Sequence, residues 1–358
     1  MWYNIAILIL YVIGCRRNCM INNVSNMEAK ALVAESITTT AACLAAGEYI
    51  KLEENHIIAN KQLTISFTTD EFIADDVLRI GHGEEVYCAT YAEITATHVY
   101  IYEYLTEEKL LVQREHGLKI CGNVSVAIDV GYSSVKITIC TPNGVYQSGL
   151  IDRCWSGRNG EIFAVSKARD ITDVTLRWNC SDYCKDIWLF GDSYFNPRSP
   201  YRWPSYLYDN GYTQYLLSGF PGRDCHGALL DFKQALKHAT PKYAVWCMGM
   251  NNEDTKTEIN ACYLRCADEF LKICNEKGII PILSTVPNVP ERINTFKNDY
   301  VRASGRRYVD FAKAVGAEEL YSPWYEGMLF KDLVHPDVLG AKALFARFIT
   351  DFPEIMAR

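Results

Sequence analysis

The segment Lys185-Asp-Ile-Trp-Leu-Phe-Gly-Asp-Ser-Tyr-Phe-Asn196 decides how the C-terminal half of the chain folds. Its apolar run, residues 187–190, is short enough to be one buried strand, and it ends abruptly in Gly191, Asp192 and Ser193. Open α/β sheets bind their ligands at the carboxyl ends of the strands, so Ser193 is predicted to lie at such a crevice. We interpret Ser193 as a candidate nucleophile, which requires a base, an orienting acid and oxyanion donors elsewhere in the chain.

Strands and helices are predicted to alternate from residue 186 to the end of the chain. Strands are predicted at 187–190, 212–218, 243–248, 279–283 and 308–310, and helices at 225–238, 257–276, 294–303 and 338–352. This alternation is typical of a parallel sheet with helices on both faces. The fold class predicted for residues 185–358 is therefore a three-layer α/β/α domain.

The preceding part, residues 28–180, is predicted to be a β-sandwich domain. Apolar and polar residues alternate at 63–68, 93–102, 123–129 and 134–140, with turn signals between these runs. Short turns without a helical stretch indicate antiparallel sheets. The Ala-rich residues 28–50 are expected to be weakly helical. The strand rhythm loosely resembles concanavalin-like or laminin-G jelly rolls, many of which bind sugars, and the alternative is an accessory sheet without a ligand.

The composition is that of an ordinary globular protein with a mildly acidic balance. The chain has 358 residues, 49% of them hydrophobic, with 36 basic and 43 acidic residues and a net charge of −7. Nucleic-acid binding needs a basic face, so this class of partner is not expected. No spacing of Cys, His or acidic residues indicates a metal site, and no cofactor is predicted. The sequence predicts no particular oligomeric state.

The cysteines and the N-terminus bear on localisation. Most of the 14 cysteines lie in apolar runs, which favours reduced thiols and a cytoplasmic protein. One or two disulfides near Cys154, Cys180 and Cys184 are the alternative. Residues 4–15 form an apolar run of signal-peptide length, too short for a transmembrane helix, so stable membrane insertion is not expected. Residues 1–27 are interpreted as a leader, with a secretion or lipoprotein signal as the other possibility.

Among the seven histidines, only His335 lies in a loop with a carboxylate at short, fixed range. Asp332 and His335 share one tight loop, where the carboxylate can hold the imidazole in the tautomer that accepts a proton from serine. Two turns offer oxyanion donors. A glycine of the turn 219–222, after the predicted strand 212–218, can expose a backbone N–H, and an asparagine of the turn 249–252, after the predicted strand 243–248, can offer a side-chain N–H. All these segments are expected to meet at one edge of the sheet.

These four segments together resemble the SGNH, or GDSL-type, family of esterases and lipases. The matching blocks are Gly191-Asp-Ser193, the turn ending at Gly222, Gly249-Met-Asn-Asn252 and Asp332-Leu-Val-His335, over about residues 186–358. The resemblance implies a flavodoxin-like domain with Ser193 as nucleophile, His335 as general base and acid, and Asp332 as its orienter. It also implies an oxyanion hole made of the backbone N–H groups of Ser193 and Gly222 and the Asn251 side chain. The family usually has Asp where this chain has Asn252, and many members have Leu where it has Tyr194.

The expected reaction is hydrolysis of a small-molecule or glycan ester, with removal of a small acyl group such as acetyl. Aromatic rings suit sugar rings, so the expected substrate contacts are Tyr194, Phe195, Arg202 and Trp203. Packing of Trp203 in the core is the alternative. Two other functions remain open: hydrolysis of a lipid ester or thioester, and a catalytically silent glycan-binding protein. An imidazole far from Ser193 would favour the silent protein.

Overall fold

The computed structural model describes residues 36–54, 60–84, 87–104, 108–152, 161–196, 201–252, 257–318 and 323–357. The expected leader, residues 1–27, and Cys154 lie outside these ranges. Cys180 and Cys184 both carry free thiols. Within the described ranges, no helix combines the length and the apolar character needed to cross a membrane.

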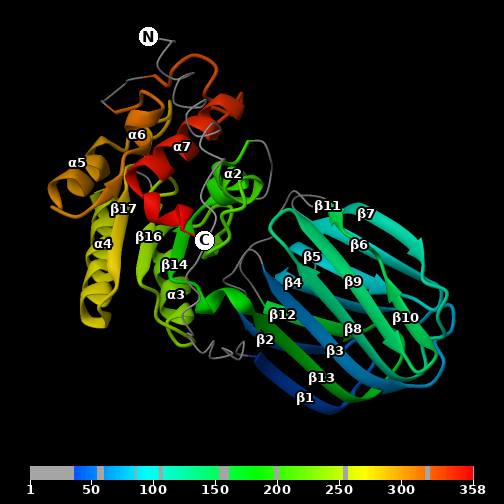
Figure 1. Ribbon diagram of the computed structural model, residues 1–358. Helices are drawn as coiled ribbons and strands as arrows, with labels where there is room; N and C mark the ends of the chain where they lie inside the picture. Colours follow the sequence, from blue (N-terminus) through cyan, green and yellow to red (C-terminus); the bar gives the residue numbers. More distant parts are fainter. Residues whose placement is uncertain are drawn as a thin grey trace, which may run out of the picture. The chain divides into compact units, whose positions relative to one another are not determined.

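The N-terminal part is a sandwich of two antiparallel sheets, as predicted (Figure 1). One sheet has the strand order β1-β13-β3-β8-β9-β10 with β11 paired to β9, and the other has the order β2-β12-β4-β5-β6-β7. Their bounds are β1 Ser36–Leu44, β2 Tyr49–Glu54, β3 Lys61–Thr69, β4 Leu78–Glu84, β5 Tyr87–Ile94, β6 His98–Tyr104, β7 Glu108–Glu115, β8 Gly122–Val130, β9 Ser134–Thr141, β10 Gly144–Gln147, β11 Ile151–Asp152, β12 Glu161–Ser166 and β13 Ile171–Cys180. Alternate residues of β3 are buried, as the period-two pattern requires.

Two predictions in this part are wrong. The segment expected to be weakly helical contains β1, because Thr38, Thr39 and Thr40 favour a strand and β13 pairs with it along its length. The run 93–102 is not one strand but the end of β5, a turn and the start of β6. The Thr95 hydroxyl accepts a hydrogen bond from the backbone N–H of His98 at 3.0 Å and thereby closes that turn.

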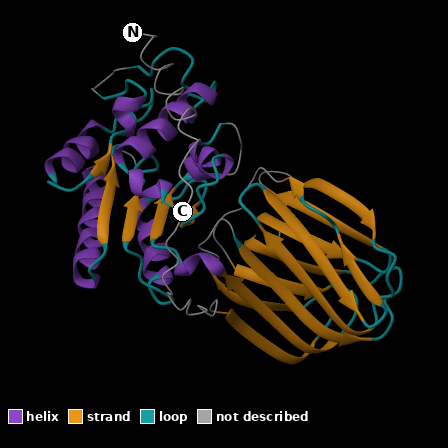
Figure 2. Cartoon of the chain, in the orientation of Figure 1, coloured by secondary structure: helices purple, strands orange, loops and turns teal. Residues whose placement is uncertain are grey.

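The C-terminal part is a five-stranded parallel sheet with helices on both faces, which confirms the predicted fold class (Figure 2). Its strands are β14 Ile187–Gly191, β15 Tyr215–Gly219, β16 Tyr243–Trp246, β17 Ile280–Ser284 and β18 Tyr308–Val309. Its α-helices are α2 Trp203–Asp209, α3 Cys225–Ala235, α4 Thr257–Lys277, α5 Thr295–Ala303, α6 Phe311–Ala314 and α7 Val338–Asp351, and its 3₁₀ turns are η1 Ser181–Cys184, η2 Ser193–Phe195 and η3 Pro353–Met356.

The two faces of this sheet bury alternate residues of each strand. Trp188 and Phe190 of β14 lie in the same core cluster as residues of α3, α4 and α5. Ile187 and Leu189 lie in a second cluster with residues of α2, α6 and α7. Both faces of β14 are therefore apolar, which explains why its sequence reads as a continuous hydrophobic run.

The strand order of the sheet is β15-β14-β16-β17-β18. The candidate nucleophile follows β14, the strand at which the direction of strand addition reverses. The chain leaves β14 for β15 on one side and later returns to add β16 on the other side. In open α/β sheets the crevice that binds ligands lies at this switch point, outside the carboxyl ends of the strands. Ser193 stands two residues after the end of β14 and so lies at the carboxyl end of that strand.

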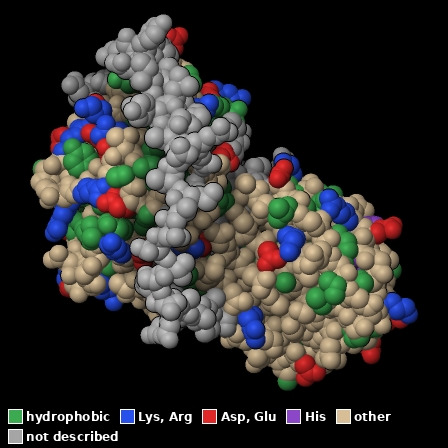
Figure 3. Space-filling model, viewed as in Figure 1, with side chains coloured by type: hydrophobic (Ala, Val, Ile, Leu, Met, Phe, Trp, Pro, Cys, Tyr) green, Lys and Arg blue, Asp and Glu red, His purple; other side chains and the backbone are tan. Residues whose placement is uncertain are grey.

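Charged side chains of both signs are interspersed over the face shown in Figure 3. Such a mixed face agrees with the mildly acidic composition.

Candidate active site

Glycines at the ends of β14 and β15 shape the turn that carries Ser193. A Cβ atom at Gly191 would lie 2.5 Å from the ring of Phe195, and one at Gly219 would lie 2.8 Å from the same ring. The absence of both side chains lets Phe195 close over the strand ends. The Asp192 carboxylate then accepts the backbone N–H of Tyr194 at 3.0 Å and begins η2. The turn leaves Ser193 half-buried at the edge of the sheet.

The loop before α7 holds the histidine through a dense set of hydrogen bonds. Asp332 Oδ1 accepts the backbone N–H groups of Val334 and His335 at 3.0 and 2.9 Å. The backbone N–H of Phe330 donates to the His335 carbonyl at 2.8 Å. Leu333, which lies between Asp332 and His335, has a φ of 59°. This left-handed conformation costs a residue with a Cβ roughly 1–2 kcal/mol. The loop therefore accepts backbone strain to bring the Asp332 carboxylate back onto His335.

The structure brings Ser193, His335 and Asp332 into one hydrogen-bonded chain. His335 Nε2 lies 2.8 Å from Ser193 Oγ, and His335 Nδ1 lies 2.8 Å from Asp332 Oδ2. With the Asp332 carboxylate ionised, Nδ1 carries the proton and donates to it, which leaves Nε2 free to accept the serine proton. Both distances are those of ordinary strong hydrogen bonds.

The electrostatics of the site keep Asp332 ionised. Partial burial on its own would raise the pKa of Asp332, but the hydrogen bonds from the backbone N–H groups of His335 and Val334 and from the His335 ring outweigh it. The pKa of this carboxyl is therefore held below its usual range. The anion that orients His335 persists into acid conditions.

Asn251 and Gly222 lie after the strands on either side of β14, as predicted. Gly222 has a φ of 73°, which a residue with a side chain adopts only under strain. The Asn251 side-chain amide donates one hydrogen to the carbonyl of Arg223 at 3.0 Å, and its second N–H remains for another acceptor. Among the described residues, no acceptor is found for the backbone N–H of Ser193 or of Gly222.

Two cations that sequence reasoning missed hold the Asn251 loop. Arg292 Nη1 donates to Asn251 Oδ1 at 3.2 Å and to the Met250 carbonyl at 3.0 Å. Lys297, which has no exposed surface, donates to the carbonyls of Gly249 and Asn252 at 2.7 and 2.5 Å. Neither residue stands in a motif, because both reach the loop from the segment around α5. The available sequence signal for Lys297 was only its place in an amphipathic helix, which does not show that the lysine is buried.

Asn252 is buried and accepts a hydrogen bond through its side chain. Its Oδ1 accepts the backbone N–H of Cys225 at 3.2 Å, at the start of α3. A carboxylate would accept the same hydrogen bond, so the amide preserves this link between the Asn251 loop and α3.

The four residues expected to contact substrate are all buried. Phe195 and Trp203 pack edge to face in the core, where Trp203 also contacts Phe348 of α7. Arg202 is 6% exposed and Tyr194 is 7% exposed. The burial of Phe195 and Trp203 favours the alternative of core packing, because these rings fill the space between β14, α2 and α7.

Asp192 is the most deeply buried carboxylate beside the site. Burial raises its pKa to about 6, although its hydrogen bond from Tyr194 and the charges of Arg202 and Arg292 oppose this rise. Its position inside the turn makes it a structural support for η2 and leaves it remote from solvent.

Comparisons with known proteins give structural matches only. No protein-family model and no curated protein matches the chain. A GDSL-like lipase from Bacteroides thetaiotaomicron matches with 17% identity over 47% of this chain and 87% of its own, at a TM-score of 0.38. A lipase/acylhydrolase from Enterococcus faecalis matches with 21% identity over 48% of this chain and 96% of its own, at a TM-score of 0.37. An acetylxylan esterase from Geobacillus stearothermophilus matches with 17% identity over 47% of this chain and 94% of its own, at a TM-score of 0.36. Over about half of its length, the chain thus has structural matches among GDSL-type lipases, acylhydrolases and esterases.

Proposed function

We propose that this protein is a serine ester hydrolase that removes a small acyl group through an acyl-enzyme. The observation that carries the proposal is the hydrogen-bonded chain from Ser193 Oγ through His335 to Asp332, with both links at 2.8 Å. This is the arrangement that converts a weak hydroxyl into a nucleophile at neutral pH. A silent binding protein would not require an imidazole within direct hydrogen-bonding reach of a serine.

In the proposed reaction, Ser193 Oγ attacks the ester carbonyl while His335 Nε2 takes the hydroxyl proton. The tetrahedral oxyanion receives hydrogen bonds from the backbone N–H groups of Ser193 and Gly222 and from the Asn251 amide. The alcohol leaves with the proton from His335. A water molecule then gives its proton to His335, attacks the acyl carbonyl and releases the acid together with free Ser193.

For the substrate, we propose an acylated carbohydrate, with acetyl as the acyl group. The support is the openness of the described part of the site. The Asp332 side chain is 42% exposed and the neighbouring Leu333 is 51% exposed, so the histidine loop faces water. A hydrophilic alcohol such as a sugar can stay partly hydrated while its ester reaches Ser193, whereas a long acyl chain needs apolar enclosure.

The test is hydrolysis of p-nitrophenyl acetate by the wild type, Ser193→Ala and the control Ser181→Ala, which changes an exposed serine outside the site. We expect Ser193→Ala to abolish turnover and the control to retain it. A fluorophosphonate probe should label the peptide that contains Ser193 and no other serine. Turnover by Ser193→Ala at the wild-type rate would refute the proposal.

A substrate panel then separates the ester classes. Acetylated mono- and oligosaccharides, p-nitrophenyl esters of increasing chain length and acyl thioesters are compared by kcat/KM. The carbohydrate proposal predicts that acetylated sugars are hydrolysed best. A kcat/KM that rises steadily with chain length would replace it with a lipid ester, and preference for thioesters would replace it with a thioesterase.

A further inference from the structure

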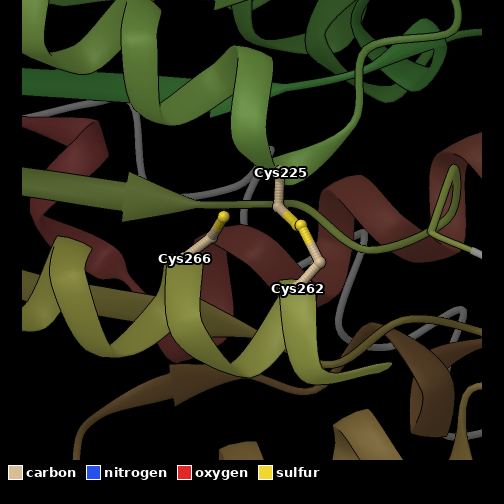
Figure 4. Close-up of side chains that lie close together, drawn as sticks. All are labelled: Cys225, Cys262 and Cys266. Atoms are coloured by element: carbon tan, nitrogen blue, oxygen red, sulfur yellow. The ribbon is translucent and has the colours of Figure 1, made fainter. Parts of the chain in front are cut away.

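Three cysteines that play no part in the proposed chemistry meet between α3 and α4 (Figure 4). Cys225 is the first residue of α3, while Cys262 and Cys266 lie one turn apart on α4. Their three Sγ atoms all lie within 4.8 Å of one another. Cys225 and Cys266 are buried, and Cys262 is half-buried. Two of the three thiols are therefore shielded from solvent, and the third is partly accessible to it.

The local structure holds these thiols in place without help from a ligand. Residues four apart on a helix project from the same face, so Cys262 and Cys266 both point toward α3. The Asp224 side chain caps α3 by accepting the backbone N–H of Gly227 at 2.7 Å, and Asn252 accepts the N–H of Cys225. The third thiol is therefore fixed opposite the pair before anything binds.

The spacing of the sulfurs suits a single metal ion. Thiolates that bind one zinc ion at about 2.3 Å lie roughly 3.8 Å from one another in a tetrahedron. The Sγ atoms of the three cysteines lie within 4.8 Å of one another, so these distances need to shorten only slightly. Rotation of the half-buried Cys262 side chain can bring its sulfur closer. Three sulfur ligands favour thiophilic ions over magnesium or calcium, which prefer oxygen.

The position of Cys225 also suits an anionic ligand. Cys225 stands at the N-terminus of an eleven-residue helix, where the backbone dipole favours an anion. The thiols of Cys225 and Cys262 are within hydrogen-bonding reach of Cys266, so the three sulfurs are in direct contact. A metal ion would displace the remaining thiol protons when it binds.

A disulfide is a poorer explanation of this arrangement. A disulfide joins two sulfurs at about 2.05 Å and would leave the third thiol of the group without a role. Cys262 and Cys266 lie on successive turns of one helix, which is an unfavourable geometry for a direct bridge. Among the described residues, ten cysteines carry free thiols, and the three cysteines of this group are among them.

We propose that Cys225, Cys262 and Cys266 bind one closed-shell thiophilic metal ion, zinc(II) or copper(I), that links α3 to α4. Among the described residues, no further His, Cys, Asp or Glu atom joins the group. Zinc would therefore complete its tetrahedron with water, whereas copper(I) would be three-coordinate. The sequence-based expectation of no metal site overlooked this group, because the third ligand lies on a different helix from the pair.

The probes are the metal ions themselves. The protein is the full chain, which is first reduced and then freed of metal with a chelator. One arm titrates Zn²⁺ against a chromophoric chelator, and a second, anaerobic arm titrates Cu⁺ against a copper(I) chelator. We expect one ion per chain in at least one arm, and the arm with the tighter complex identifies the metal. Cobalt(II) in place of zinc should give the charge-transfer absorption of several thiolate ligands.

Single variants locate the ion. Cys225→Ser, Cys262→Ser and Cys266→Ser should each lose stoichiometric binding, and the melting temperature of these variants should no longer rise when metal is added. Cys274→Ser is the matched control, because Cys274 is a buried free cysteine of the same helix outside the group. It should bind one ion as the wild type does.

A measurement on the wild type avoids dependence on variants that fail to fold. Bound metal should protect three thiols from alkylation, and mass spectrometry should assign them to Cys225, Cys262 and Cys266. The proposal fails if neither metal binds with a stoichiometry of one, if Cys262→Ser binds like the wild type, or if a disulfide between two of these cysteines forms in place of the metal complex.

Discussion

The hydroxyl of Tyr194 donates a hydrogen bond to the backbone carbonyl of Val334 at 2.6 Å. Tyr194 follows Ser193 and Val334 precedes His335, so this bond joins the loops that carry the proposed nucleophile and the proposed base. Tyr194 is almost fully buried, which shields the bond from water. This bond therefore ties the segment that carries Ser193 to the segment that carries His335.

Tyr194→Phe removes that bond and leaves the ring in place. We expect kcat to fall by about tenfold to a hundredfold with little change in KM, because small displacements of a catalytic group have large effects on rate. The free energy of unfolding should fall by about 1 kcal/mol. Steady-state kinetics and urea unfolding measure both quantities. Tyr212→Phe, a change outside the site, is the control, and an unaltered kcat in Tyr194→Phe would contradict the positioning role.

Asp332→Asn separates the two tasks of that carboxylate. The amide oxygen can still accept the backbone N–H groups of Val334 and His335, so the loop should keep its fold. It no longer stabilises the imidazolium or selects the tautomer, and we expect kcat to fall roughly 10³- to 10⁴-fold. Ester turnover and the melting temperature are compared with those of Asp299→Asn, which alters an exposed carboxylate. Retention of more than a tenth of the activity would argue against Asp332 as the orienting acid.

Asn251→Ala removes a proposed oxyanion donor. The expected loss is about 10²- to 10³-fold in kcat, because the donor acts on charge that develops in the transition state. KM should change little. Kinetics with p-nitrophenyl acetate test this prediction, and Asn275→Ala, on the exposed side of α4, serves as control. A rise in KM at constant kcat would instead make Asn251 a substrate-binding residue.

Lys297→Met replaces a buried ammonium group with an apolar side chain of similar length. The carbonyls of Gly249 and Asn252 lose their donor, and we expect the free energy of unfolding to fall by about 2–4 kcal/mol. The rate should fall as well, since the same loop carries Asn251. Chemical unfolding and kinetics provide the measurements. Lys313→Met, at an exposed lysine, should change neither, and equal behaviour of the two variants would contradict the role of Lys297.

Asp192 gives a pH dependence of stability. Its folded-state pKa is raised to about 6, so the folded chain holds a proton that the unfolded chain has already lost. Its contribution to stability is therefore complete below the ordinary pKa of an aspartate and is lost as the pH rises through about 6. Asp192→Asn cannot ionise and keeps the acceptor for the Tyr194 N–H. Relative to the wild type, the variant should gain about 2–3 kcal/mol between about pH 4 and about pH 7.

Urea unfolding at a series of pH values measures this gain. Ser193→Ala retains the Asp192 carboxylate and should follow the pH profile of the wild type. A constant difference between Asp192→Asn and the wild type across the range would show that Asp192 does not titrate there.

The α/β part was predictable because local sequence and tertiary structure agree in it. Each predicted strand and helix occurs with bounds shifted by only a few residues, since short apolar runs and capping residues such as Asp224 mark them. In β1 the two levels disagree. Ala41 and Ala42 favour a helix locally, but pairing of Ile37 with Trp178 on β13 makes the segment a strand.

The candidate site was predictable where its geometry is local. Asp332 and His335 share one short loop, and Ser193 closely follows the buried strand β14, so the sequence around them already indicates their arrangement. Arg292 and Lys297 contact backbone carbonyls that are distant in sequence. The residues near them form no pattern that predicts these contacts. Trp203 was ambiguous from sequence, because an aromatic side chain near a candidate nucleophile suits both a pocket and a core, and only packing favours one of them.

The sandwich begins and ends on neighbouring strands. β1 pairs with β13, and Ser36 at the start of one lies opposite Asn179 near the end of the other. A domain whose two ends meet in this way can be inserted into a chain, or removed from it, without rerouting the sequence that follows. The path of the chain through β1 and β13 therefore enters and leaves the β-sandwich at one place.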